Sequence, residues 1–222
     1  MRRHLIQLTC VIALIAAFAT AAAGIPSFRG YTGLMLIPTA DALGEGDWNV
    51  GLMMEDITDD TTVNDVFANY GIAEGVEVGL NRFRFDDDSD ADTIINGKYA
   101  FQQETPQRPG IAAGIMDLTD EMDSTVYVVA SKSLTAQLGT YEGDVINPRV
   151  HVGIGGGSLD GLFGGVSAYV GNRIQVMAEW DSENVQLGAR LRLTPGLTIH
   201  AGFFDVGDDG DFGLGVSFGR SY

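Results

Sequence analysis

The chain has 222 residues, with 30 acidic side chains against 13 basic ones and a formal net charge of −17 at neutral pH. This excess of carboxylates argues against nucleic acid, anionic lipid surfaces and phosphate-bearing substrates as partners, and it favours cations as counter-ions. The length suits one domain, and no segment beyond the first residues shows a convincing helical period or a long apolar run.

Residues 1–23 are typical of a secretory signal peptide. A basic start is followed by an apolar run over residues 5–18 and by the small residues 19–23, after which a signal peptidase would cut. The apolar run is too short for a membrane anchor that stays. Cleavage removes two arginines and changes the formal charge from −17 to −19. We therefore expect an exported protein.

The single cysteine, Cys10, lies inside this predicted signal. It comes too early in the apolar run to be a lipid-attachment site, and its loss leaves a mature chain without disulfides or thiolate ligands. The acidic stretches lack the spacing of a calcium loop, and the glycine-rich run 153–158 lacks the lysine of a phosphate loop. We expect no metal centre and no cofactor.

Residues 24–47 form an N-terminal segment that precedes the regular pattern. Pro38 disfavours a central strand position, so the segment is either the edge of a first strand or a strap tucked into a barrel. Residues 48–222 then form the barrel itself.

From residue 48 onward, apolar and polar residues alternate in segment after segment. Period-two patterning with charges on one face predicts an all-β, antiparallel transmembrane β-barrel of about twelve strands, with 10 to 14 possible. The long connection 139–147 leaves the count open by one pair, and the phase of 82–84 and 131–133 is ambiguous. The predicted strands are 48–56, 64–70, 76–85, 93–101, 110–117, 125–133, 148–155, 161–170, 173–181, 184–193, 197–203 and 212–222.

The last strand has the clearest alternation. Apolar side chains occupy every second position from Phe212 to Phe218, glycine and serine lie between them, and the chain ends on Tyr222. One face suits lipid and the other suits a crowded or wet interior. The terminal strand is also the segment that we expect the barrel-assembly machinery to bind.

The inward phase of the strands carries a ladder of charged and histidine side chains. We expect their opposite signs to pair across strands and to fill much of the interior. The predicted lumen-lining residues are Glu55, Glu77, Lys98, Arg149, His151, Arg173, Glu179, Arg190, Arg192 and His200.

Alternate connections fall on opposite sides of the membrane. Short, nearly neutral turns such as 71–74 and 194–196 face the periplasm, and acidic connections face outward. The acidic rim serves solubility and cation bridging to glycolipid, or else it forms a cation-selective mouth. The predicted acidic outer-loop residues are Asp59, Asp60, Asp86, Asp87, Asp88, Asp90, Asp92, Asp208 and Asp209.

Aromatic residues cluster at predicted strand ends. Such residues form girdles at the two membrane interfaces. The predicted girdle comprises Trp48, Tyr70, Trp180, Phe203, Phe212 and Tyr222.

Several motifs are similar to those of the YjbH-type outer-membrane barrel family. They begin with the glycine- and proline-containing stretch 30–46 and continue through 69–80, 110–117 and 130–132, as well as 161–165 and 177–181. The chain resembles a single barrel module of that family. The resemblance implies an envelope role associated with exopolysaccharide, with extracellular polysaccharide or its export machinery as the partner, and it supplies no catalytic residues.

We expect the protein to lie in the bacterial outer membrane, and three functions remain open for it. The first is a structural or export-linked role in extracellular polysaccharide, and the second is a small passive cation-preferring porin. The third, a barrel hydrolase, is disfavoured because His151 and His200 show no serine and third group near the same membrane edge. We expect no enzymatic activity.

Overall fold

The computed structural model describes residues 24–58, 61–85, 91–134, 146–171, 173–207 and 210–220. The predicted signal 1–23 and Tyr222 lie outside these residues. In the part that is described, there is no helix long and apolar enough to cross a membrane.

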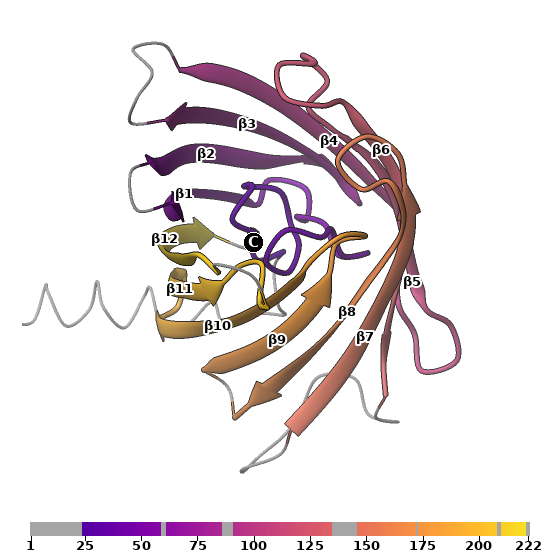
Figure 1. Cartoon of the computed structure of the whole chain (residues 1–222). Coiled ribbons are helices and arrows are strands. Elements are labelled where there is room, and N and C mark those ends of the chain that lie inside the picture. Colours follow the sequence, from indigo (N-terminus) through magenta and orange to yellow (C-terminus); the bar gives the residue numbers. More distant parts are fainter. Residues whose placement is uncertain are drawn as a thin grey trace, which may run out of the picture.

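Twelve antiparallel strands close into one barrel (Figure 1). Each strand pairs with its neighbours in the chain, and the last pairs with the first, which confirms the predicted fold class. The strands are β1 (Trp48–Thr58), β2 (Thr61–Ala73), β3 (Val76–Phe85), β4 (Asp92–Gln102), β5 (Gly110–Met116), β6 (Thr125–Ser133), β7 (Ile146–Gly155), β8 (Gly161–Val170), β9 (Ile174–Trp180), β10 (Val185–Thr194), β11 (Leu197–Phe203) and β12 (Phe212–Arg220).

The alternation in sequence sets which side chains face lipid. At the closing seam, Val50 pairs with Phe218 and Leu52 pairs with Val216, and all four side chains are exposed on the outer surface. The residues between them face the interior, because successive side chains of a strand point to opposite faces. An exposed apolar belt of this kind is what a bilayer solvates.

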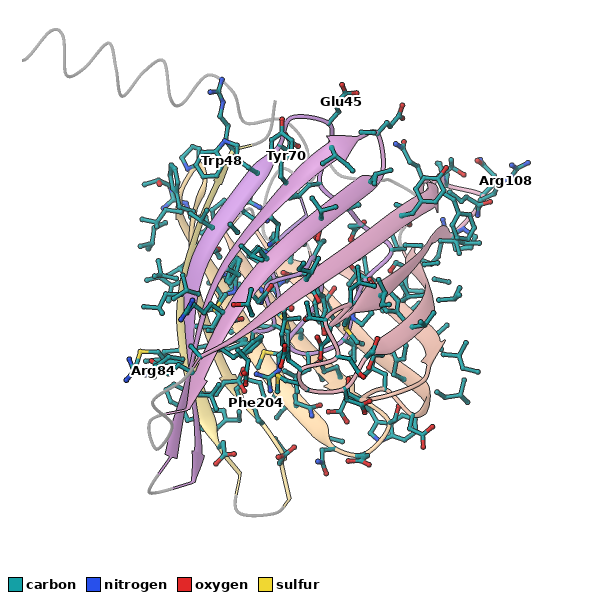
Figure 2. The ribbon with its side chains drawn as sticks, turned by 90° about the horizontal axis from the view of Figure 1, so that it is seen from above. Glu45, Trp48, Tyr70, Arg84, Arg108 and Phe204 are labelled. Atoms are coloured by element: carbon teal, nitrogen blue, oxygen red, sulfur yellow. The ribbon has the colours of Figure 1, made fainter. Side chains whose placement is uncertain are left out.

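The two ends of the barrel differ. The acidic end carries the connections after β1, β3, β5, β7, β9 and β11, and the short-turn end carries the remaining ones. Figure 2 shows Glu45 and Arg108 at the short-turn end and Phe204 at the acidic end.

Residues 24–47 belong to no named strand and lie inside the barrel (Figure 1). We call this segment the plug. Two isolated bridges, Pro26 with Thr32 and Gly33 with Pro38, fold it back on itself. Its apolar side chains have 1% or less of their surface exposed at Phe28, Leu34, Met35, Ile37 and Leu43. The core of the molecule is therefore the contact between the plug and the inner wall.

The structure resolves the ambiguous phases. Phe83 faces inward, where it clusters with Val63 and Ile94, so Arg82 and Arg84 face outward. Ser131 and Ser133 face inward at the end of β6. Residues 135–145 lie outside the described ranges, yet β6 and β7 pair directly, and the described strands number twelve.

Candidate functional site: the plug and the inner wall

The plug enters and leaves the lumen at the same end. The carbonyl of Gly24 accepts a hydrogen bond of 3.2 Å from Asn49 near the start of β1. At the acidic end, Phe28 packs edge-on against Phe204 with ring centroids 5.1 Å apart. The chain then returns, and Gly46 donates to the carbonyl of Gly71 at 2.9 Å on the short-turn side. The plug thus runs the length of the lumen and back.

Glu179 of β9 binds the tip of the plug. A turn closed by the hydrogen bond from Leu34 N to Ile37 O, 2.9 Å long, presents consecutive backbone N–H groups. The Glu179 carboxylate accepts from Met35 at 2.8 Å, from Leu36 at 2.5 Å and from Ile37 at 3.2 Å. Because Glu179 is 3% exposed, its charge is compensated by these donors rather than by water.

Glu77 and Lys98 bind the plug from adjacent strands. They lie directly opposite each other in the β3–β4 register. Glu77 accepts from Thr32 N at 2.9 Å, from Thr32 Oγ1 at 2.6 Å and from Leu43 N at 2.9 Å. Lys98 Nζ donates to the carbonyls of Thr32 and Asp41. One pair of adjacent strands therefore binds the plug at two places, at Thr32 and at the stretch from Asp41 to Leu43.

Arg190 of β10 binds plug carbonyls on the opposite wall. Its Nη2 donates to Pro26 O at 2.8 Å, to Gly33 O at 2.9 Å and to Leu34 O. The three carbonyls share the two N–H groups of Nη2, while Nε and Nη1 donate to His200 and Gln175 on the wall.

Arg149 of β7 joins the plug to the loop between β4 and β5, which lies at the short-turn end. Its guanidinium makes a two-point contact with Asp41 at 2.7 and 3.0 Å and reaches Glu104 at 2.9 Å. Lys132 lies 3.6 Å from the same Glu104. These four residues join the plug, β6, β7 and the connection between β4 and β5.

The expectation that opposite charges of the ladder pair across strands is wrong. Among the described residues, the ion pairs are Arg29–Glu55, Arg149–Asp41, Arg149–Glu104 and Lys132–Glu104, and none joins two ladder residues. The physical reason is the plug. Its backbone needs donors and acceptors inside the barrel, and ladder side chains supply them.

A column of asparagines also binds the plug, and the sequence reading did not single it out. Asn69 donates to Gly30 O at 2.5 Å, and Asn81 donates to Arg29 O at 2.6 Å. Asn96 in turn donates to Asn81 at 3.0 Å. Their inward positions in the strands could have predicted such contacts, since a buried side-chain amide needs a hydrogen-bond partner.

Glycines on the inner wall make room for plug side chains. A Cβ built on Gly202 would lie 1.8 Å from Met35 Cε, and one on Gly188 would lie 2.1 Å from Met35 Sδ. A Cβ on Gly165 would lie 2.8 Å from Leu34. The glycine-rich inner faces thus suit a crowded interior rather than a wet one.

Both histidines contact serines, which the sequence reading had not seen. His151 Nδ1 lies 2.8 Å from Ser131 Oγ, and its Nε2 lies 3.2 Å from Ser167 Oγ. The amide of Ala40, a plug residue, donates to the same Ser131 oxygen at 2.9 Å. The pairing of β6 with β7 and of β7 with β8 brings these serines to His151, a contact that the sequence prediction had not included.

His200 has its tautomer fixed by Arg190. Arg190 Nε donates to His200 Nδ1 at 3.2 Å, and arginine has no acceptor, so Nδ1 carries no proton. His200 Nε2 therefore carries the proton and donates to Ser217 Oγ at 2.8 Å. Neither histidine donates a hydrogen bond to a carboxylate that would orient it as a base.

Most predicted lumen residues lie on the inner wall. Arg149 and Arg192 are half-buried, and the buried ones are Glu55, Glu77, Lys98, His151, Glu179, Arg190 and His200. The prediction that Arg173 lines the lumen is wrong. This residue lies in the turn before β9 with an exposed side chain, and its carbonyl accepts from the amide of Arg192 at 2.8 Å. The strand begins one residue later than predicted, so Arg173 does not face the lumen.

The other predicted sets are described in part. Asp92 begins β4 and is half-buried, and the remaining acidic residues lie outside the described residues: Asp59, Asp60, Asp86, Asp87, Asp88, Asp90, Asp208 and Asp209. In the girdle set, Trp48 packs against Phe218 with centroids 5.7 Å apart, and Phe203 packs against Phe212 at 5.0 Å. Tyr70 and Trp180 are exposed on the outer surface.

Asp117 organises the connection between β5 and β6. Its carboxylate accepts from the amides of Met122 at 2.6 Å and Asp123 at 3.1 Å and from Thr119 Oγ1 at 2.7 Å. Burial opposes ionisation, but these hydrogen bonds outweigh it and hold the pKa of Asp117 below its usual value.

The plug fills the interior beside β3–β6. The hollow beside Tyr31, Glu77, Lys98 and Tyr127 does not admit a water molecule. In the described part of the chain, no group of three or more histidine, cysteine or acidic side chains is arranged to hold a metal ion. What the site can do is close the barrel by an internal segment that the wall holds at many points.

No protein-family model matches the chain, and no curated protein is similar to it in sequence. Solved structures are similar in fold. A KdgM porin aligns with a TM-score of 0.56 over 77% of this chain and 98% of its own length, at 10% identity. A KdgM porin in complex with disordered oligogalacturonate gives 0.52 over 78% and 98%, at 11% identity. Omp33 of Acinetobacter baumannii gives 0.50 over 78% and 98%, at 12% identity. The chain therefore has the fold of outer-membrane β-barrel porins.

Proposed function

We propose that the protein is a bacterial outer-membrane β-barrel, closed by its own N-terminal segment, with a structural or export-linked role in extracellular polysaccharide. The observation that carries this proposal is the way Glu77, Glu179 and Arg190 bind the plug backbone. A diffusion pore needs these charged side chains to face water in an open lumen. Here they are taken up by buried amides and carbonyls.

The polysaccharide part of the proposal rests on the resemblance to the YjbH-type family. Its partners are the export machinery, extracellular polysaccharide and membrane glycolipid, and its strand β12 is the segment that the assembly machinery recognises. The role is not enzymatic. Both Ser–His contacts lie beneath the plug, where Ala40 already donates to Ser131.

Two measurements test this proposal together. We expect the refolded chain to be silent in planar bilayers while it shows heat-modifiable migration in gels, and we expect deletion of the gene to lower extracellular polysaccharide. Complementation by the wild-type gene should restore the polysaccharide. Stable conductance steps would refute the closed barrel, and unchanged polysaccharide would refute the export-linked role.

The second candidate is a cation-preferring porin that conducts when the plug withdraws. The likeness in fold to KdgM and Omp33 favours it, and one of those KdgM structures holds an oligogalacturonate. The acidic connections would then select cations at the mouth. Replacing the aspartates of 86–92 by asparagine should lower cation preference in a conducting variant, whereas unchanged selectivity would remove these residues from the mouth.

A further inference from the structure

Two arginines on β3 face away from the barrel. The outward phase of this strand runs through Val78, Leu80, Arg82 and Arg84, because the intervening Phe83 is buried on the inside. Figure 2 shows Arg84 extending outward from the strands, on the side of the barrel that also carries Trp48 and Tyr70. Both arginine side chains are exposed.

Their neighbours in the described structure are not acidic. Arg82 lies opposite Val66 and Thr93 in register, and Arg84 lies opposite Asn64. No carboxylate whose side chain the structure describes is within ion-pair distance of either guanidinium. An arginine on a lipid-facing surface costs about 2–4 kcal/mol at the bilayer midplane and less near the interface. The pair therefore belongs at the headgroup level with an anionic partner.

The placement of the other cations makes this pair distinctive. Arg108, Lys132, Arg173 and Arg220 lie at the short-turn end, and the remaining cations of residues 24–222 project into the lumen. The net negative charge of the chain argues against anionic surfaces in general. Among the side chains that the structure describes on the outside of β1–β4, the two charges nearer the acidic end are positive.

An apolar groove runs along the same face. Its volume is about 480 Å³, and the small side chain of Ala68 lies between larger neighbours. Leu80 is two residues from Arg82, a step of about 7 Å along a strand. The groove is lined by Trp48, Val50, Ala68, Asn69, Tyr70, Val78, Gly79, Leu80 and Ile95.

We propose that this face of β1–β4 binds a membrane lipid with a phosphate-bearing headgroup. Arg82 and Arg84 bind the phosphate, since guanidinium groups match phosphate oxygens with paired donors. An acyl chain of the same lipid lies in the groove toward Trp48. The proposal does not depend on whether the lumen is open, so it stands or falls separately from the proposed function.

The groove contains one of the two tryptophans of the chain, which allows a direct test. Trp180→Phe leaves Trp48 as the sole tryptophan. The variant is refolded into vesicles of phosphatidylcholine with a fraction of phosphatidylglycerol or lipid A. Bromine is carried in turn on the acyl chains of the zwitterionic and the anionic lipid, at equal bromine density. Quenching of Trp48 then reports which lipid occupies the groove.

We expect brominated anionic lipid to quench Trp48 about threefold to tenfold more than brominated zwitterionic lipid does, because two partly exposed arginine–phosphate contacts favour it. Replacing Arg82 and Arg84 by glutamine should remove the preference. Replacing Arg173 and Arg220 by glutamine is the matched control, since it removes the same charge at the other end. Ala68→Leu should lower quenching by both lipids, whereas Ala189→Leu on β10 should not.

Three results would overturn the proposal. Equal quenching by both lipids would show no headgroup selection. Loss of preference in the Arg173/Arg220 variant but not in the Arg82/Arg84 variant would place the anionic lipid in the opposite leaflet. Loss of preference on adding a chelator would show that a divalent cation bound to the acidic connections bridges the phosphate, instead of the arginines. Heat-modifiable migration of each variant confirms that it is folded.

Discussion

Individual side chains of the barrel wall make the hydrogen bonds that the plug backbone would make with a neighbouring strand if it were part of a sheet. A buried amide without a partner costs about 1–3 kcal/mol, and the plug has no strand partner along most of its length. Glu179 alone satisfies three such amides. The inner wall is thus specific for this segment in its plugged conformation.

Replacing Glu179 by alanine should therefore loosen the plug without opening the barrel wall. Three amides lose their acceptor, so the free energy of docking should fall by about 3 kcal/mol or more. Hydrogen exchange at Met35, Leu36 and Ile37 should become faster relative to strand amides. Gln186→Ala is the control, because Gln186 is also buried but binds Asp181. Unchanged protection in the Glu179 variant would contradict this account.

The contact between Gly202 and Met35 should behave as a coupled pair. Gly202→Ala places a Cβ 1.8 Å from the flexible end of Met35 and should cost about 1–3 kcal/mol of docking free energy. In a Met35→Ala background the added methyl has room, so the double variant should lose less than the sum of the single losses. Hydrogen exchange of plug amides measures all four states. Gly156→Ala, with nothing within 4 Å of its Cβ, should be neutral, and additive losses would refute the coupling.

At the scale of elements, the connection between β5 and β6 depends on an ionised Asp117. Its folded pKa is lowered, so the stabilisation is complete above the ordinary aspartate pKa of about 4 and is lost as the pH falls through the lower folded pKa. Protection of the Met122 amide should fall over that acid range. Asp117→Ala should show low protection at every pH, and Asp123→Asn, which removes the same charge, should keep the wild-type profile. A flat wild-type profile would contradict the role of Asp117.

The strands were predictable because lipid imposes alternation on them. All twelve were placed from period-two patterning, and Arg173 failed only because strand ends are ambiguous by a residue. Met177 is an apolar residue in an inward position, and the structure explains it, since Met177 lines the space around Gly188 that receives Met35. The contacts of the ladder were not predictable, because their partners lie in a segment without a period.

For the whole molecule, closure can be made reversible by a disulfide. A Cβ on Gly110 would lie 3.3 Å from Ala40 Cβ, close to the separation of about 3.5–4.5 Å found in disulfides. In an A40C/G110C/E179A variant expressed from residue 24, no other cysteine is present. We expect conductance steps under reduction and silence after oxidation. The A40C/E179A variant should conduct under both conditions, and current through the oxidised lock would show that the plug does not close the barrel.

The conformation of the plug could not be predicted from the sequence. Residues 30–46 contain an apolar run and one proline, which fit either a strand edge or a strap, and only the contacts with the surrounding wall distinguish the two. In the structure, Pro38 takes part in an isolated bridge, and Ile37 is fully buried inside the lumen. The choice depends on contacts between Glu179 and residues more than 140 positions away.

Because the plug enters and leaves at one end and continues without a linker into β1, it behaves as a ligand covalently attached beside its own receptor. A short tether of this kind sets an effective concentration on the order of millimolar. A free peptide that copies residues 28–43 would therefore compete poorly for the lumen at micromolar concentration. Any physiological opening must weaken the wall contacts or pull on the segment, since dilution cannot release it.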